Sequence, residues 1–148
     1  MLFSRENERG ETEYALHLRK KGFHAGDYCA PGGHSKLGET YGECAKREAL
    51  EELGVRLLNT RQAHLLYRRA YIIEEKTGKR IFKPIDEIRP DMVIVVSRWS
   101  GQFKNKEPEK HSSIEWFSQF NLPKNIVPYV KQAIELIATG SRRSRHGF

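Results

Sequence analysis

The sequence predicts a single α/β domain, and three observations support this fold class. A chain of 148 residues can bury one hydrophobic core and is too short for two typical domains. Residues Met92 to Trp99 are almost continuously apolar and rich in β-branched side chains, which is typical of a strand buried on both faces at the centre of a sheet. Helical periodicity occurs twice, from Tyr41 to Leu53 and again after Pro128. These helices are expected to cover a sheet.

The first part of the chain predicts two paired strands and a glycine-containing turn. Apolar and polar residues alternate from Tyr14 to Arg19, and Met1–Phe3 is the expected hairpin partner across the turn at Glu8–Glu11. A short apolar segment at Tyr28–Ala30 leads into Pro31-Gly32-Gly33. Glycines at such a place allow the backbone to approach a ligand closely.

The first helix has recognisable ends. Thr40 and Glu43 have the spacing of a capping box, and Gly54 is expected to end the helix. The helix is therefore predicted from about Tyr41 to Leu53. Three apolar residues on the side away from its acidic face are expected to pack on the core: Ala49, Leu50 and Leu53.

The second half of the chain predicts further strands and one more helix. A long strand is expected from Gln62 to Glu75, turned by Lys76–Lys79 toward Arg80–Phe82. A polar loop from Ser100 to Ser113 precedes a short strand at Ile114–Phe117. The last helix opens near Pro128, and its expected packing face comprises Val130, Ala133, Ile134, Ile137 and Ala138. The tail, residues 139–148, has no hydrophobic period, and we expect it to be a mobile basic segment of the same domain.

Three carboxylates of the first helix share one face. Glu48, Glu51 and Glu52 stand at positions i, i+3 and i+4, within roughly 100° of arc. Two unit charges about 4 Å apart repel by about 4 kcal/mol at an effective dielectric constant of about 20. The dipole at the helix end also disfavours acids there, so a cation is expected among them.

The ligand types indicate which cation to expect. Clustered carboxylates suit Mg²⁺ or Mn²⁺, which retain water ligands and bind through substrate phosphates. Zinc is not expected, because Cys29, Cys44 and the six histidines show no recognised zinc spacing.

This stretch resembles the Nudix box. The fixed positions of that motif are all matched here, by Gly33, Glu39, Arg47, Glu48, Ala49, Glu51, Glu52, Gly54 and Val55. The resemblance implies a three-layer α/β/α sandwich with a mixed central sheet and a divalent cation. It also implies that the substrate is a nucleoside diphosphate linked to a further group, with a MutT-like nucleotide pyrophosphohydrolase as the expected enzyme.

The resemblance also implies roles for individual residues. Glu48, Glu51, Glu52 and the carbonyl of Gly32 would hold the metal, Arg47 would orient a glutamate, and Glu39 would fix the loop before the helix. A loop acid would either add a metal ligand or accept a proton from the attacking water, with Glu109 the first choice and Glu107 the second. Three residues are expected to contact the substrate: Arg19 through phosphate, Asn125 through the base, and Gly33 through its backbone.

Composition sets the expected surroundings of the protein. The chain contains no apolar run long enough to span a membrane and no signal peptide, so we expect a cytoplasmic protein without a membrane partner. A net charge of +7 suits an anionic nucleotide, and we expect a monomer or homodimer.

Two other classes of function remain open. A non-catalytic Nudix module would bind a nucleotide without cleaving it, although the intact acidic residues argue against this. The basic tail would favour an enzyme that acts on the 5′ pyrophosphate of RNA, although nucleic acid is not the expected partner. Tyr71 lies near the place of a tyrosine in dinucleoside-polyphosphate hydrolases, but a tyrosine in a strand is common.

Overall fold

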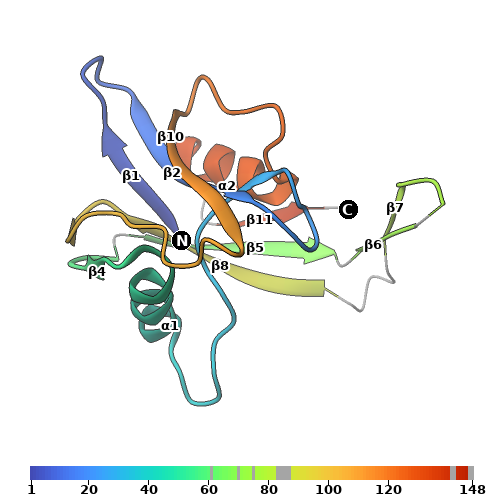
Figure 1. Cartoon of the computed structure of the whole chain (residues 1–148), viewed down its shortest axis with the longest axis horizontal. Coiled ribbons are helices and arrows are strands. Elements are labelled where there is room, and N and C mark those ends of the chain that lie inside the picture. The colour runs from blue at the N-terminus through green and yellow to red at the C-terminus, as the bar shows by residue number, and fades with distance from the viewer. Residues whose placement is uncertain (61, 70, 75, 83–87, 141–142, 147–148) are drawn as a thin grey trace.

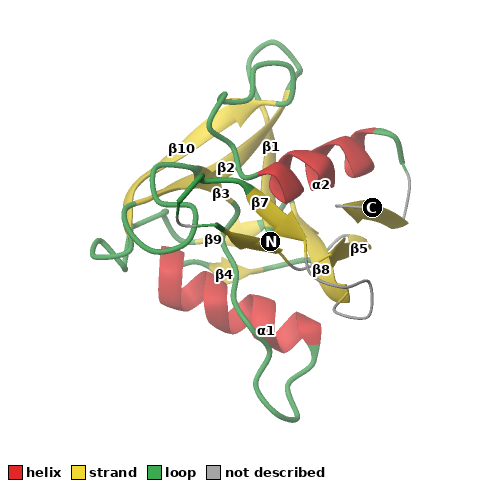
Figure 2. Ribbon diagram, turned by 90° about the vertical axis from the view of Figure 1, so that its right-hand side faces the viewer, coloured by secondary structure: helices red, strands yellow, loops and turns green. Residues whose placement is uncertain are grey.

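A mixed sheet lies between two helices, as Figures 1 and 2 show. The computed structural model describes residues 1–60, 62–69, 71–74, 76–82, 88–140 and 143–146. Helix α1 (Tyr41–Glu48), continued by the wider π-helical turn η1 (Ala49–Leu53), covers one face of the sheet, and α2 (Pro128–Ala138) covers the other. The expected α/β/α layering is therefore confirmed.

The main sheet has the strand order β10-β2-β1-β8-β5-β11, with β3 paired to β2. The pairs β1/β8 and β5/β11 are parallel and the others antiparallel, so the sheet is mixed as expected. The strands of this sheet are β1 (Leu2–Glu6), β2 (Thr12–Arg19), β3 (Tyr28–Cys29), β5 (Gln62–Arg69), β8 (Ile88–Val96), β10 (His111–Ser118) and β11 (Arg143–His146). Two short ribbons lie beside it: β4 (Arg56–Leu57) with β9 (Trp99–Ser100), and β6 (Tyr71–Ile73) with β7 (Arg80–Phe82).

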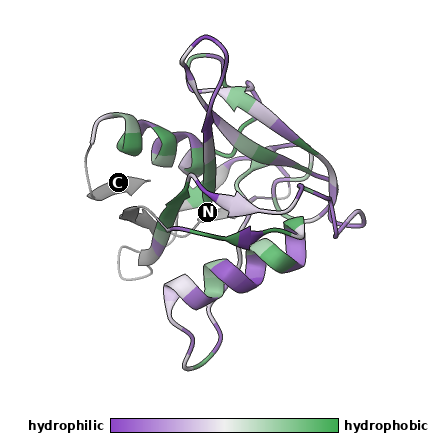
Figure 3. Cartoon of the chain, turned by 90° about the vertical axis from the view of Figure 1, so that its left-hand side faces the viewer, coloured by the Kyte–Doolittle hydropathy of each residue, from purple (hydrophilic) through white to green (hydrophobic). Residues whose placement is uncertain are grey.

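The core consists of two apolar layers, one on each face of the sheet. Because successive side chains of a strand point to opposite faces, the neighbours Leu2 and Phe3 enter different layers. Leu2 packs with Val130 and Ile134 of α2. In Figure 3 the α1 region is striped, since hydrophobic and hydrophilic residues alternate along it. The hydrophobic stripe is Ala45, Ala49 and Leu53, all buried against the sheet.

Both predicted ends of the first helix are confirmed. The Thr40 side chain accepts a hydrogen bond from the Glu43 backbone, and the Glu43 carboxylate accepts one in return from the Thr40 backbone. Gly54 adopts the left-handed conformation with φ = 68°. The prediction for Leu50 was wrong, because this side chain is 46% exposed. The buried stripe repeats every four residues, and Leu50 lies about 100° away from it.

Several predicted boundaries differ from the structure. The long strand expected from Gln62 is divided, because β5 ends at Arg69 and β6 pairs with β7 in a separate ribbon. Its predicted end, Glu75, lies outside the described residues. On α2, Ala138 is exposed and Leu136 is buried instead.

The tail also differs from its prediction. Residues Arg143–His146 form β11, which pairs parallel to β5 at the edge of the main sheet. A strand can acquire regular structure from a distant edge without any periodicity of its own. None of the helices that the structure describes is both long and apolar enough to span a membrane.

Candidate active site

Gly33 makes room for the first carboxylate of the box. A Cβ atom added at Gly33 would lie only 2.1 Å from Oε1 of Glu48. The neighbouring Gly32 has φ = 151°, a conformation that L side chains rarely adopt, and its backbone N–H donates to Oε2 of Glu52 at 2.9 Å. The turn predicted from its glycines therefore contacts two of the three expected metal-binding glutamates.

Arg47 connects the acidic residues on the other side of the cluster. Its guanidinium binds Glu39 with two hydrogen bonds, from Nε at 2.8 Å and from Nη2 at 2.9 Å. Its Nη1 donates to Glu48 at 2.6 Å and to Glu51 at 3.2 Å. The hydrogen bonds from Arg47 lower the pKa of Glu39 to about 2, so this carboxylate is ionised at neutral pH. A planar fork with several donors can hold this arrangement, whereas a lysine has no such geometry.

Glu52 is the most deeply buried of the three helical carboxylates. Glu52 as a whole residue is 8% exposed, whereas the side chains alone of Glu48 and Glu51 are 14% and 52% exposed. Burial, together with the charges of Glu48 and Glu107, raises the pKa of Glu52 to about 7 against the lowering effect of the Gly32 hydrogen bond. A carboxylate in such surroundings favours a nearby cation. The site therefore fits a divalent metal ion by its donor atoms and by its charge.

A cavity of about 730 Å³ opens beside Glu52. The glycine turn lines it on one side, and Tyr129 and Val130 of α2 lie in its wall. Three cationic residues also line it: Arg19, Lys21 and Lys110. A second hollow of about 750 Å³ lies between the β1–β2 turn and the end of β10, and it contains none of the box glutamates. The cavity beside Glu52 is therefore the candidate substrate site.

The two candidate loop acids occupy different surroundings. Glu107 is partly buried, accepts a hydrogen bond from Lys110 at 2.6 Å, and its charge acts on Glu52. The backbone of Lys106 also donates to the Glu52 carbonyl at 3.0 Å, which ties this loop to the helix end. Glu109 is exposed. These positions favour Glu107 over Glu109, the reverse of the order that the sequence suggested.

The other described residues that the sequence singled out do not gather at the cavity. Asn125 is exposed, its side chain donates to the Gly26 carbonyl at 2.7 Å, and it is not among the residues that line the cavity. Trp116 and Phe117 pack against the two opposite core layers, as their neighbouring places on a strand require. The side chain of Tyr71 lies outside the described residues.

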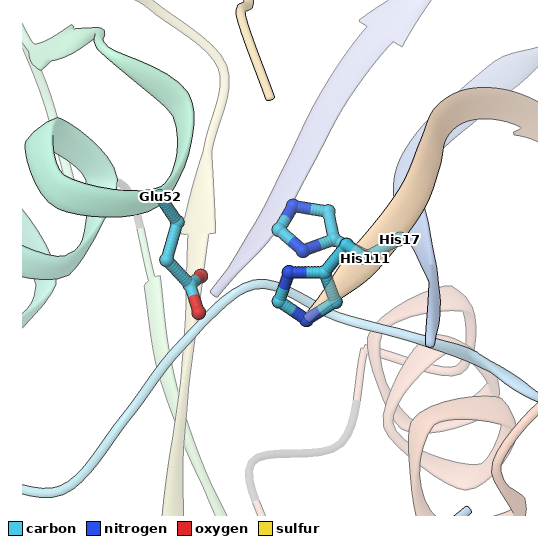
Figure 4. Close-up of side chains that lie close together, drawn as sticks. All are labelled: His17, Glu52 and His111. Carbon is cyan, nitrogen blue, oxygen red and sulfur yellow. The ribbon is translucent and has the colours of Figure 1, made fainter. Parts of the chain in front are cut away.

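Two buried histidines near Glu52 were not predicted. His17 of β2 and His111 of β10 are 1% and 6% exposed, and their ring centroids lie 4.3 Å apart. Figure 4 shows both rings on the side toward which the Glu52 carboxylate points. A histidine within a strand pattern carries no local signal, so only the pairing of β2 with β10 reveals this cluster.

Comparison with known proteins identifies the family. A model of the NUDIX domain matches residues 2–137. The chain belongs to the Nudix family. As a Nudix hydrolase it acts on pyrophosphate-containing substrates, and hydrolases of this family generally use a divalent metal ion.

Solved structures agree with this fold. A MutT NUDIX hydrolase from Burkholderia pseudomallei is 26% identical, with a TM-score of 0.62 over 90% of this chain and 92% of that one. A mutator MutT protein from Bacillus halodurans is 18% identical, with a TM-score of 0.62 over 99% and 90% of the two chains. The Nudix domain of Shewanella oneidensis NrtR, solved with ADP ribose, is 13% identical, with a TM-score of 0.58 over 94% and 83%. The last two likenesses concern the fold alone.

Proposed function

We propose that this Nudix hydrolase is a Mg²⁺-dependent pyrophosphohydrolase of nucleoside triphosphates or deoxynucleoside triphosphates. One observation carries the proposal. The Arg47-linked glutamates of the box lie next to a cavity whose wall contains both Glu52 and a set of cationic side chains. Carboxylates for a metal and cations for phosphates are thus side by side, as hydrolysis of a polyphosphate requires.

The metal would be held by oxygen atoms. We assign Glu48, Glu51 and Glu52 to it, with the Gly32 carbonyl as a further ligand, because Mg²⁺ and Mn²⁺ prefer oxygen donors. When bound, such an ion neutralises phosphate charge and lowers the pKa of water. Arg47 would keep Glu48 and Glu51 in place, and its two bonds to Glu39 would fix the guanidinium itself.

The remaining steps fall to residues around the cavity. Arg19, Lys21 and Lys110 would bind the phosphate oxygens, which places the reacting phosphorus near Glu52. Glu107 would accept the proton of the attacking water, because it is the partly buried loop acid whose charge reaches Glu52. Glu109, the first choice from the sequence, becomes the second choice for this role.

The cavity also suits the nucleoside. Its volume lies within the range typical of pockets for small ligands, roughly 300–1,000 Å³. Apolar residues of its wall, including Ala30 and Met92, would contact the sugar and base.

We also propose that the protein is cytoplasmic. Both cysteines are free thiols, which fits a reducing compartment.

A substrate panel tests this proposal. Purified protein would be incubated with Mg²⁺ and each of the eight common NTPs and dNTPs, ADP-ribose, a dinucleoside tetraphosphate and 5′-triphosphorylated RNA. Release of a nucleoside monophosphate and pyrophosphate from one or more of the triphosphates is the expected result. Preferred cleavage of ADP-ribose, the dinucleoside or the RNA would refute the proposed substrate class. Binding of nucleotides without cleavage of any would favour the non-catalytic module.

The panel needs a control for contaminating hydrolases. Glu52→Gln removes one charge from the proposed site, whereas Glu135→Gln makes the same chemical change on the exposed face of α2. Activity that belongs to this chain should be lost in the first variant and kept in the second. Equal activity in both preparations would assign the cleavage to a contaminant.

A further inference from the structure

The two buried histidines form a polar cluster on the neighbouring strands β2 and β10. His17 lies two residues before the end of β2, and His111 opens β10 at a register shift between His111 and Ser113. A bulge of this kind re-aims the side chain that it carries. The two strands are neighbours, so the rings meet edge to face although they are distant in sequence.

Three of the four nitrogen atoms of these rings lack a hydrogen-bond partner among the described residues. Among the described residues, neither Nδ1 nor Nε2 of His17 has a hydrogen bond, and Nδ1 of His111 has none either. Leaving a buried polar group unpaired is unfavourable, and native proteins rarely do so without a reason. Three unpaired nitrogens in one place therefore mark this cluster as a candidate ligand site.

Glu52 supplies a third ligand of different chemistry. One nitrogen from each ring and one carboxylate oxygen of Glu52 all lie within 4.8 Å of one another. Ligand atoms about 2.1 Å from a common zinc ion lie about 3.4 Å apart in tetrahedral coordination, so the widest of these separations would have to shorten by up to about 1.4 Å for all three atoms to bind one ion. Figure 4 shows the carboxylate facing the rings.

Both rings lie in surroundings that disfavour a positive charge on them. Burial lowers the pKa of His17 to about 3, with His111, the Met1 ammonium and Arg19 contributing to the same direction. Burial also lowers the pKa of His111. Burial therefore disfavours the charged imidazolium form of both rings.

The surrounding charges do not exclude a cation. Arg19, Lys110 and the Met1 ammonium act on the two rings as positive charges. Glu48 and Glu107 act on Glu52, and Glu107 and Glu109 act on His111, as negative charges. With Glu52 itself, four carboxylates therefore face three cationic groups.

We propose that His17, His111 and Glu52 form a nitrogen-rich site for a divalent transition-metal ion of the zinc class. Two imidazoles and one carboxylate are a ligand set that Zn²⁺ and Co²⁺ accept and that Mg²⁺ does not favour. The site shares Glu52 with the proposed magnesium site but does not depend on the proposed hydrolysis. The absence of zinc spacing in the sequence does not bear on it, because the ligands come from three separate elements.

Metal binding without nucleotide tests the proposal. Metal-free protein would be titrated with Co²⁺ and then with Zn²⁺, while the visible absorption of Co²⁺ and the heat of Zn²⁺ binding are recorded. One equivalent of Co²⁺ with the visible bands of nitrogen ligation, displaced by one equivalent of Zn²⁺, is the expected result. The absence of any stoichiometric Zn²⁺ or Co²⁺ binding would overturn the proposal.

Variants assign the ligands. His17→Gln and His111→Gln should each lower the affinity for Zn²⁺ by at least about tenfold and leave the affinity for Mg²⁺ within about threefold. His34→Gln, which changes an exposed histidine near the cavity, should bind Zn²⁺ like the wild type. Wild-type Zn²⁺ affinity in both folded cluster variants would overturn the assignment.

A measurement on the unaltered protein guards against variants that fail to fold. Ring-nitrogen NMR of the wild type with histidine labelled with ¹⁵N should show the resonances of two histidines shifting on addition of Zn²⁺ and not of Mg²⁺. Ring resonances of the buried histidines that stay unchanged with Zn²⁺ would refute the site. No readout here uses turnover, so failure of this proposal and failure of the proposed hydrolysis are distinguishable.

Discussion

Gly33→Ala is the substitution that most sharply separates catalysis from folding. The added Cβ would lie 2.1 Å from Oε1 and 2.4 Å from Cδ of Glu48, whereas ordinary van der Waals contact begins at 3.4 Å. The carboxylate would therefore have to withdraw by about 1 Å or more, and a displacement of about 1 Å at a reacting centre can lower the rate about 100-fold. We expect a loss of about 100-fold in kcat/KM, equivalent to about 2.7 kcal/mol.

The same substitution should leave the fold nearly intact. The atoms that must move belong to the end of a flexible side chain, and the main loss is the 2.6 Å hydrogen bond from Arg47. A hydrogen bond to a charged group contributes about 1.5–3 kcal/mol, so Tm should fall by less than about 12 °C. Kinetics with the preferred nucleotide, thermal unfolding and Mn²⁺ binding followed by electron paramagnetic resonance would measure the three effects.

Gly42→Ala provides the matched control. The added Cβ meets no atom within 4 Å, and the residue lies in α1 near the site. Because Gly42 lies in the first turn, its replacement by alanine should raise stability by at most about 1 kcal/mol with activity unchanged. A folded Gly33→Ala variant with activity and Mn²⁺ affinity within threefold of the wild type would refute the reasoning, as would global unfolding of that variant.

Three further predictions concern the groups around the cluster. Arg47→Lys should lower kcat by about 10–100-fold with little change in KM, because lysine cannot make the paired hydrogen bonds to Glu39. Wild-type kinetics in the Arg47→Lys variant would show that these hydrogen bonds are dispensable. Glu107→Gln should lower kcat by about 10²–10⁴-fold, and Glu109→Gln should lower it by less than about threefold. The reverse order in pH–rate measurements would assign the role of catalytic base to Glu109. The pKa of Glu39 is lowered from 4.5 to about 2, so its contribution to stability is present above pH 4.5 and is lost as the pH falls toward 2. Acid unfolding monitored by circular dichroism should therefore be less steep in Glu39→Gln over this range, and identical profiles would contradict the assigned pairing.

Local patterns made much of the fold and site predictable. The capping residues Thr40 and Glu43, the terminating Gly54 and the spacing of the glutamates all lie within one helix, where geometry follows directly from sequence separation. The apolar run around Val93 to Val96 likewise indicated the buried central strand. Such features depend on neighbours a few residues away.

Features that depend on distant pairing were missed. The strand β11 forms against β5, and the tail has no periodicity that could announce it. The meeting of His17 with His111 depends on the register of β2 and β10. The proposed preference for Glu107 over Glu109 depends on how the loop returns to the helix end, where the Lys106 backbone donates a hydrogen bond to the Glu52 carbonyl. Long-range contacts of this kind leave no trace in the spacing of residues.

The most direct test of the proposed hydrolysis is a Mg²⁺ titration of turnover, with the preferred nucleotide, for the wild type and Glu52→Gln. The proposed function predicts no turnover in excess EDTA and saturable recovery with Mg²⁺. It also predicts a loss of at least about 100-fold in kcat, about 2.7 kcal/mol, for the variant. The variant should be folded and at least as stable as the wild type without metal, because a buried charge near Glu48 and Glu107 is removed. Full turnover in EDTA, or wild-type rates in folded Glu52→Gln, would contradict the proposed site.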